Sequence, residues 1–366
     1  MMFVSSLVFL TLVISGHYFA WRLCLEACPR LRPGRWYLLG FFILFSVSFL
    51  AFFILLHRSE SAALASLYLV SAVLFGLLSQ LMIAGTIYWL LMQLARLCAG
   101  ACSTFFIKKR RLLARILVGL ALALFLLGTY NAFFPQVKTI FLSGWPDEYQ
   151  GKSFIQLSDL HLGAIYRPAW LAMIVKKTNA LQGDFIIISG DLFDGSDGQL
   201  AEFIPELRSF AAPIVFVPGN HDYYFSAQER EMILSKSDLI TLSDRAAILS
   251  GIEVIGFNYL NRYDSAMRRE IKDLSEQGEA TRIVVNHVPV DREEALSLKA
   301  KLMLSGHTHR GQLFPFSLFL NFLYGRFSYG LENYQGLTTY TSAGTGAWGP
   351  PLRTLFPGEI IKFVIK

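Results

Sequence analysis

The sequence predicts membrane-spanning helices at the N-terminus, followed by an α/β domain in which two mixed β-sheets lie between helices. Two observations support this fold class. The chain of 366 residues is 54% hydrophobic and only 16% charged, which is too apolar for a wholly soluble protein. After residue 136, short apolar runs alternate with predicted helices, the pattern of two packed sheets covered by helices. We therefore expect a transmembrane region at 1–135 and a soluble domain at 136–366.

Four apolar runs in the N-terminal region are long enough to cross a bilayer, which takes about 20 apolar residues. These predicted spans are 2–20, 37–56, 62–95 and 112–133. No Lys or Arg precedes the first run and no clear cleavage site follows it, so we interpret it as a retained span and not as a signal peptide. The third run is longer than one crossing requires. It is expected to tilt, protrude or break between Gly76 and Gly85, and one or two crossings stay open.

The distribution of basic residues predicts how these spans are oriented. Residues 1–150 carry 12 Lys and Arg against 4 Asp and Glu. Most of the basic residues lie in the loops 21–36 and 96–111, which are therefore expected on the cytoplasmic side. Four spans then place the soluble domain of this multi-pass membrane protein outside the cytoplasm. The net charge of +6 thus belongs to the membrane flanks, and the lack of a basic stripe or known motif predicts no nucleic-acid partner.

The soluble domain is expected to begin with strands 137–142 and 153–157. Helices between the later strands are predicted at 168–180, 198–210, 226–236 and 264–276. Further strands, expected to complete the second sheet, lie near 247–256, 337–342 and 359–365. Short loops between strand and helix are typical of this fold class.

Five apolar runs of this domain lead directly into Asp, Asn or His, usually beside Gly or Pro. Five of the seven histidines follow these runs, namely His161, His221, His287, His307 and His309. In α/β sheets, ligands bind at the carboxyl ends of strands, where side chains converge. Asp159 and His161 are two residues apart, so a regular strand would direct both to one side. The pattern indicates a metal site better than it fits histidines scattered over a surface.

These stretches resemble the motifs of the calcineurin-like metallophosphoesterase superfamily. The motifs are Asp-x-His, Gly-Asp-x-x-Asp, Gly-Asn-His-Asp, a lone His and Gly-His-x-His, and all occur here in that order. The resemblance covers roughly residues 136–366 and implies the same layering of helix, sheet, sheet and helix. It is strongest with small membrane-associated bacterial phosphoesterases, through residues 305–312 and 343–353. Arg310 departs from the pattern, which has a small residue there, and this affects access or substrate choice rather than metal binding.

The resemblance implies two divalent metal ions and assigns residues to them. The implied ligands are Asp159, His161 and His309 for the first ion, Asn220, His287 and His307 for the second, and Asp191 for both. Nitrogen and oxygen donors without a thiolate suit Mn, Fe or Zn. His221 is implied to protonate the leaving oxygen, with Asp222 orienting it. Asp194 is implied to brace the loop that follows Asp191.

The leading functional hypothesis is a membrane-anchored phosphoesterase with two metal ions. It would cleave phosphodiester or pyrophosphate bonds by attack of a metal-bound hydroxide, with a lipid-linked substrate favoured. One alternative is a hydrolase of UDP-diacylglucosamine type from lipid A synthesis, whose cytoplasmic substrate conflicts with the predicted orientation. A second is a non-catalytic sensor or transport module. The complete set of metal ligands argues against it, as do spans without embedded charged residues.

The apolar segment 313–324 follows the predicted ligand His309 almost directly. It is too short to span a bilayer and lacks the alternation of a half-buried strand. Two interpretations stay open. The segment is either buried over the edge of a sheet, or it forms a loop or short helix that enters the membrane surface beside the site.

Overall fold

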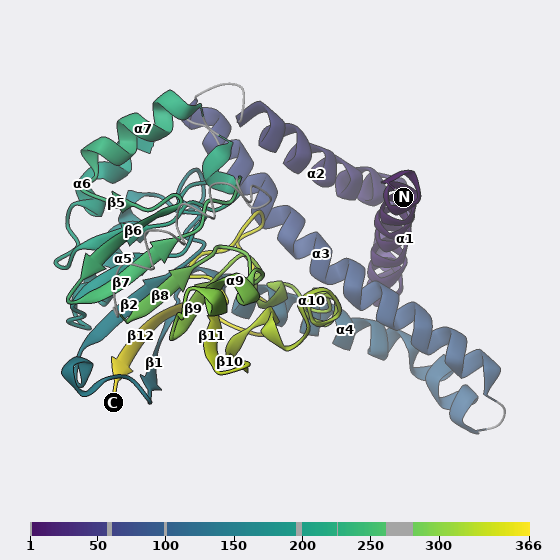
Figure 1. Ribbon diagram of the computed structural model, residues 1–366. Helices are drawn as coiled ribbons and strands as arrows, with labels where there is room; N and C mark the ends of the chain where they lie inside the picture. The colour runs from purple at the N-terminus through teal and green to yellow at the C-terminus, as the bar shows by residue number, and fades with distance from the viewer. Residues whose placement is uncertain (1, 57–60, 99–100, 195–199, 225, 261–280) are drawn as a thin grey trace. The chain divides into compact units, whose positions relative to one another are not determined.

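The computed structural model describes the chain except residues 1, 57–60, 99–100, 195–199, 225 and 261–280 (Figure 1). The chain forms two compact units. The first comprises Met1–Leu55 and Ala63–Thr129, and the second comprises Leu56–Ala62 and Tyr130–Lys366. Each unit has a hydrophobic core of its own, because separate clusters of buried apolar side chains fill them.

Long helices make up the N-terminal part of the chain. They are α1 (Met2–Ala27), α2 (Arg35–Leu56), α3 (Ala62–Leu97) and α4 (Ala101–Phe133). In the described part of the chain, three helices are long and apolar enough to cross a membrane: Arg35–Leu56, Ala62–Leu97 and Ser103–Phe133. The first predicted span is helical as part of α1, but its crossing of the membrane stays a prediction.

Helix α3 is continuous over its 36 residues, so the break expected between Gly76 and Gly85 is absent. The helix is roughly 54 Å long at 1.5 Å per residue, more than one bilayer core requires. Gly85 is the point where α1 passes closest, since a Cβ there would lie 2.5 Å from the backbone of Phe19. The break is thus excluded, whereas the number of crossings stays a prediction.

The first sheet of the second unit has the strand order β1-β12-β2-β3-β4-β5. Its strands are β1 (Gln136–Leu142), β12 (Glu359–Ile365), β2 (Ser153–Leu157), β3 (Phe185–Ile188), β4 (Ile214–Phe216) and β5 (Ile240–Thr241). The strands β2 to β5 are parallel, whereas β12 runs antiparallel to β2 and parallel to β1. The expectation that residues 359–365 belong to the second sheet is wrong, because this strand fills the position between the two N-terminal strands.

The second sheet has the order β10-β11-β9-β8-β7-β6. Its strands are β10 (Gly330–Tyr334), β11 (Leu337–Thr341), β9 (Leu302–Ser305), β8 (Arg282–Val285), β7 (Ile252–Gly256) and β6 (Arg245–Leu249). The single strand expected near 247–256 is in fact a hairpin, turned at Ser250 and Gly251, which both have positive φ. Strand β10 was not predicted, because it is a half-exposed edge strand without an apolar run.

The two sheets pack face to face. One buried cluster joins side chains of both, including Phe154 and Ile187 from the first sheet and Val254, Ile283 and Leu304 from the second. Helices cover the outer faces: α5 (Pro168–Asn179), η3 (Leu200–Phe203) with α6 (Ile204–Leu207), α7 (Ala227–Lys236) and α9 (Arg292–Ser297). A separate cluster packs α9 against β8 and β9. The predicted fold class is thereby confirmed.

Two of the predicted helices need comment. The helix expected at 198–210 is reduced to η3 and α6 within the described residues, with Pro205 in the first turn of α6. A proline is tolerated there because the first-turn N–H groups have no intrahelical partner. The helix expected at 264–276 lies outside the described residues.

The segment 313–324 contains a helix, α10 (Phe316–Tyr324), and none of the residues of that helix is buried. Of the two interpretations of this segment, burial over a sheet edge is therefore wrong for the helix. The apolar side chains of α10 do not form part of the buried core of the domain.

Candidate metal centre

The predicted site residues lie in loops at the carboxyl ends of five strands, drawn from both sheets. These loops follow β2, β3 and β4 of the first sheet and β8 and β9 of the second. Parallel strands bring their carboxyl ends to one edge of a sheet, and face-to-face packing brings the two edges together. All seven predicted metal ligands and His221 therefore meet at one end of the sandwich.

Several of these residues have strained backbones. Asp159, His161, Asp191, His307 and His309 have φ between 48° and 67°, the left-handed region that non-glycine residues rarely adopt. Such conformations persist where the surroundings enforce them, and they concentrate at functional sites. The turn after β2 is held to the turn after β3, since the N–H groups of Asp159 and His161 donate to Gly190 and Asp191.

The expected strand geometry at Asp159 and His161 is wrong. Strand β2 ends at Leu157, before either residue, so strand alternation does not aim their side chains. Left-handed backbone at Asp159 and again at His161, with Leu160 between them, aims these side chains instead. Glycine is required opposite this turn, because a Cβ on Gly306 would lie 2.4 Å from Asp159 Oδ2.

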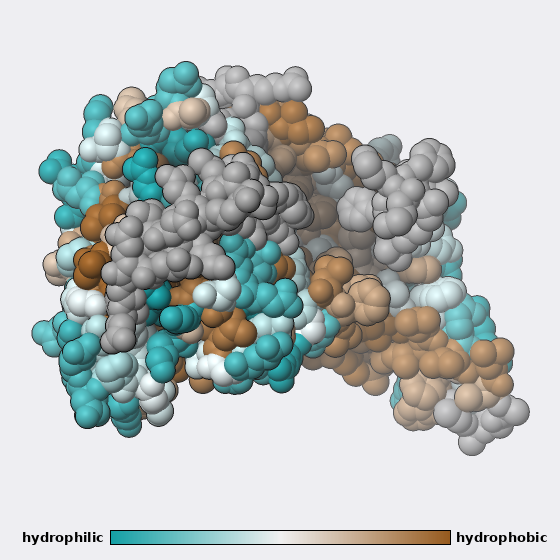
Figure 2. Space-filling view, in the orientation of Figure 1, coloured by the Kyte–Doolittle hydropathy of each residue, from teal (hydrophilic) through white to brown (hydrophobic). Residues whose placement is uncertain are grey.

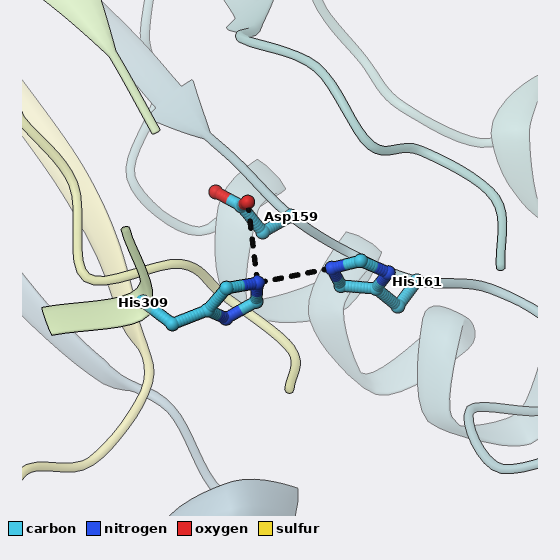
Figure 3. Close-up of side chains that lie close together, drawn as sticks. All are labelled: Asp159, His161 and His309. Carbon is cyan, nitrogen blue, oxygen red and sulfur yellow. Dashed lines mark hydrogen bonds and ion pairs between the residues drawn. The ribbon is translucent and has the colours of Figure 1, made fainter. Parts of the chain in front are cut away.

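The first cluster consists of Asp159, His161 and His309 (Figure 3). The Nε2 atoms of the two histidines lie 3.1 Å apart, and His309 Nε2 lies 3.4 Å from Asp159 Oδ1. Burial lowers the pKa of His309 well below its usual value, with His161 and Arg353 acting in the same direction. A lowered pKa favours the neutral imidazole, the form in which histidine binds a metal ion.

The second cluster consists of Asp191, His287 and His307, with Asn220 beside them. His287 Nε2 lies 3.1 Å from Asp191 Oδ2, and His307 Nδ1 lies 3.0 Å from Asn220 Oδ1. Asp191 Oδ2 is also 3.9 Å from His161 Nε2 of the first cluster. Asp191 thus lies between the two clusters, where one carboxylate can contact both.

The arrangement fits two divalent cations. His287 Nε2 is buried and has no hydrogen-bond partner among the described residues, although a carboxylate oxygen is near. Burial acts to raise the pKa of Asp191, but the imidazoles of His287, His161 and His221 outweigh it and hold that pKa below its usual range. An anionic carboxylate among imidazole nitrogens, without sulfur donors, is a set that Mn, Fe or Zn accept.

His221 belongs to neither of these two clusters, but with His161 and Asp194 it forms a third group whose ligand atoms lie close enough to hold a metal ion. The backbone N–H of His221 donates to Asp191 Oδ1 at 2.8 Å, and its ring Nδ1 lies 3.1 Å from Asp194 Oδ1. The rings of Tyr224 and Trp348 lie 4.7 and 5.8 Å from its ring. The Asp194 carboxylate thus faces His221 Nδ1 within ion-pair distance.

The expected partnership of His221 with Asp222 needs correction. The Asp222 carboxylate accepts hydrogen bonds from the N–H groups of Leu192, Phe193 and Gly219 at 2.8–3.1 Å. Asp222 therefore joins the loop after β3 to the loop after β4, the bracing role expected of Asp194. Burial and the charge of Asp191 raise the pKa of Asp222 to about 7. Asp194, not Asp222, faces His221.

Arg353, a residue without a predicted role, is fully buried. Its guanidinium donates to the carbonyl oxygens of Gly346 and His309, and its Nη2 lies 3.1 Å from His309 Nδ1. The only signal in the sequence was its place at the end of the stretch 343–353. Arg310, the departure from the family pattern, stacks over the rings of Tyr329 and Phe356.

Comparisons with known proteins agree with this geometry. Residues 152–311 match the family of calcineurin-like phosphoesterases. An uncharacterized metallophosphoesterase of Helicobacter pylori is 33% identical over 216 residues, which are 56% of this chain and 57% of that protein. A transmembrane protein with a metallophosphoesterase domain from Danio rerio is 31% identical over 60% of this chain and 54% of that protein.

The chain thus spans little more than half the length of these curated relatives. Among solved structures, a dimetal phosphatase from Danio rerio aligns with 53% of this chain and 88% of its own, at 12% identity and a TM-score of 0.37. The family match covers the loops that carry Asp159, Asp191, Asn220, His287 and His309. Residues 152–311 thus match the calcineurin-like phosphoesterase family over the motifs that predicted the resemblance.

Proposed function

We propose that this protein is a membrane-anchored, metal-dependent phosphoesterase. The observation that carries the proposal is the convergence of two ligand clusters on one carboxylate, Asp191, with His221 fixed beside them. A structural metal site would be closed by its ligands and would have no need of an oriented imidazole next to it. The non-catalytic alternative is disfavoured for the same reason.

In the proposed reaction, two bound divalent cations would activate a water and neutralise charge on the phosphoryl group. The protein's own groups do the rest. Asp191 orients His221 through its backbone N–H, and Asp194 holds its Nδ1. His221 Nε2 is then placed to give a proton to the leaving oxygen as the phosphorus–oxygen bond breaks. Tyr224 and Trp348 flank this position and favour an apolar or aromatic leaving group.

For the substrate we propose a phosphodiester or pyrophosphate ester linked to a lipid. The support is that the same chain carries three helices able to cross a membrane. Relatives described as transmembrane proteins with a metallophosphoesterase domain combine the same two parts. The UDP-diacylglucosamine alternative requires a cytoplasmic domain, which the charge distribution opposes.

The activity is tested on full-length protein in nanodiscs with bis-p-nitrophenyl phosphate. Protein stripped with EDTA should be inactive, and Mn²⁺, Fe²⁺ or Zn²⁺ should restore turnover, because the site offers only nitrogen and oxygen donors. Elemental analysis should find close to two metal ions per chain in the active sample. Unchanged hydrolysis after complete metal removal would overturn the proposal.

We further propose that the catalytic domain lies outside the cytoplasm. The basic segment 21–36 ends in the first turn of α2. The segment 96–111, expected as a loop, runs from the end of α3 into α4, and its described residues from 101 onward are helical. A single crossing by each of α2 and α3 keeps both basic segments on one side. Helix α4 then leads away from the cytoplasm. This orientation does not depend on whether α1 crosses.

In a bacterial host, alkaline phosphatase fused after Lys366 should therefore be active, and a fluorescent protein that folds only in the cytoplasm should be dark. A fusion between Leu97, where α3 ends, and Ala101, where α4 begins, serves as the opposite control. A fluorescent C-terminal fusion with inactive phosphatase would place the domain in the cytoplasm and revive the UDP-diacylglucosamine alternative.

A further inference from the structure

Helix α10 presents an apolar surface to its surroundings. It contains no charged residue, and five of its nine side chains are large, apolar and exposed by more than half. The exposed fractions are 56% for Phe316, 62% for Leu318, 63% for Phe319, 89% for Phe322 and 69% for Leu323. Figure 2 shows hydrophobic residues where α10 lies in Figure 1. Single exposed apolar residues are ordinary, but a contiguous patch marks a surface that binds something.

The polar contacts of this segment hold the helix to the domain. Asn321 Oδ1 accepts a hydrogen bond from Ser328 Oγ at 2.6 Å, and the N–H of Phe314 donates to Thr354 Oγ1 at 2.8 Å. Gly311 fits against the backbone of Ser317, where a Cβ would lie 2.3 Å from the Cα. The apolar side chains are therefore displayed on an anchored helix.

Both ends of this segment lie beside the metal centre. The short helix η5 (His309–Gly311) begins at a proposed metal ligand and contacts α10. At the other end of α10, the ring of Tyr324 lies 6.5 Å from the ring of His307, a ligand of the second cluster. A partner bound to the apolar face of α10 would thus lie next to the metal centre.

The chain itself identifies what covers this face. Helix α4, which is able to cross a membrane, ends at Phe133, and β1 begins at Gln136. Two connecting residues reach at most about 7 Å, so the domain stays at the bilayer surface. Phe and Leu on one side of a helix too short to span are typical of segments lying in the interface.

The last turn of α4 is also fastened to the domain close to the metal centre. Within the second unit, Asn131 Nδ2 donates to the carbonyl oxygen of Arg353 at 3.1 Å. The guanidinium of Arg353 in turn contacts His309. Trp170 Nε1 donates to the carbonyl oxygen of Phe133 at 2.8 Å. The end of a membrane-spanning helix is therefore one residue removed from a proposed metal ligand.

We infer that α10 docks on the lipid bilayer in which the chain's own apolar helices lie, and so holds the metal centre at the level of the lipid headgroups. A phosphoester linked to a lipid would then reach the metal ions with its acyl chains still in the bilayer. This second part rests on the proposed function, whereas the docking itself does not.

Docking is tested by photocrosslinking of the full-length protein in nanodiscs of phosphatidylethanolamine and phosphatidylglycerol. The photoreactive residue p-benzoylphenylalanine replaces Phe322 and, in a matched control, Ile248, an apolar residue of β6 that is 71% exposed. Mass spectrometry should find lipid adducts at position 322 and not at 248. Adducts between protein chains at 322 would show a second copy as the occupant, and equal lipid labelling at both positions would show no docking. Either result overturns the inference.

The consequence for catalysis is tested with two diesters that share a leaving group, bis-p-nitrophenyl phosphate and dioleoylphosphatidyl-p-nitrophenol. Phe319→Ser with Phe322→Ser should lower turnover of the lipid by about tenfold, the order expected when buried aromatic contacts are lost, and leave the soluble diester unchanged. Equal loss on both diesters would overturn the link to the lipid substrate. Inactivity of the wild-type protein on both would count against the proposed function alone, because the crosslinking result stands without turnover.

Discussion

Replacing Asp191 with Asn should abolish metal-dependent hydrolysis and leave the domain folded. Asp191 Oδ2 faces His287 of one cluster and His161 of the other, so the charge of a single carboxylate is shared by both. An amide carries no charge and offers only one oxygen. Loss of groups that merely orient metal ligands typically costs about 10–100-fold, so loss of the shared ligand should exceed ~100-fold.

The fold should survive because Asn has the shape of Asp and tolerates the left-handed backbone at this position, where φ is 51°. An Asn oxygen at the place of Oδ1 can still accept the N–H of His221. The matched control is Asp238→Asn, which changes an exposed partner of Arg208 in the same domain. Elemental analysis should find fewer than two metal ions per chain in Asp191→Asn alone. Near-wild-type activity in that variant would exclude a site with two metal ions.

The strands and the ligand residues were predictable because each predicted ligand follows a buried strand within a few residues. Strands β3 and β8 carry apolar side chains on both faces, for example Ile186 and Ile187 in β3 and Val284 and Val285 in β8. Such runs indicate strands that are covered on both sides. The loop residues that follow these strands lie close together, because parallel strands have their carboxyl ends at the same edge of a sheet. For that reason the sequence was sufficient to place Asp191 and His287 at one site.

The contacts within the site were not predictable in the same way. Asp194 and Asp222 are both acidic and close to His221 in the fold, and only the turn geometry decides which one faces the imidazole. The segment 313–324 posed a different problem, because a buried segment and one facing lipid are equally rich in Phe and Leu. Apolar side chains are stabilised by leaving water, and this holds equally for burial in a protein core and for insertion into a bilayer.

Replacing His221 with Ala should keep both metal ions and slow turnover by about 10²–10⁴-fold, the usual contribution of a positioned acid or base. His221 is a member of neither of the two clusters that meet at Asp191, and its backbone N–H, which donates to Asp191, remains in alanine. The loss should be large for alkyl phosphodiesters, whose leaving oxygen must be protonated. It should be small for p-nitrophenyl esters, because p-nitrophenolate leaves without a proton.

A companion variant separates the two carboxylates. Asp194→Asn should show the same dependence on the leaving group with a smaller loss, because Asp194 lies 3.1 Å from His221 Nδ1 and acts through it. Asp222→Asn should instead lower the melting temperature, because Asp222 joins two loops through three backbone N–H groups. Rates on a series of leaving groups, measured beside metal content, distinguish these effects. An equal loss on alkyl and p-nitrophenyl esters in His221→Ala would remove His221 as the proton donor and leave it only a role in binding the phosphoryl group.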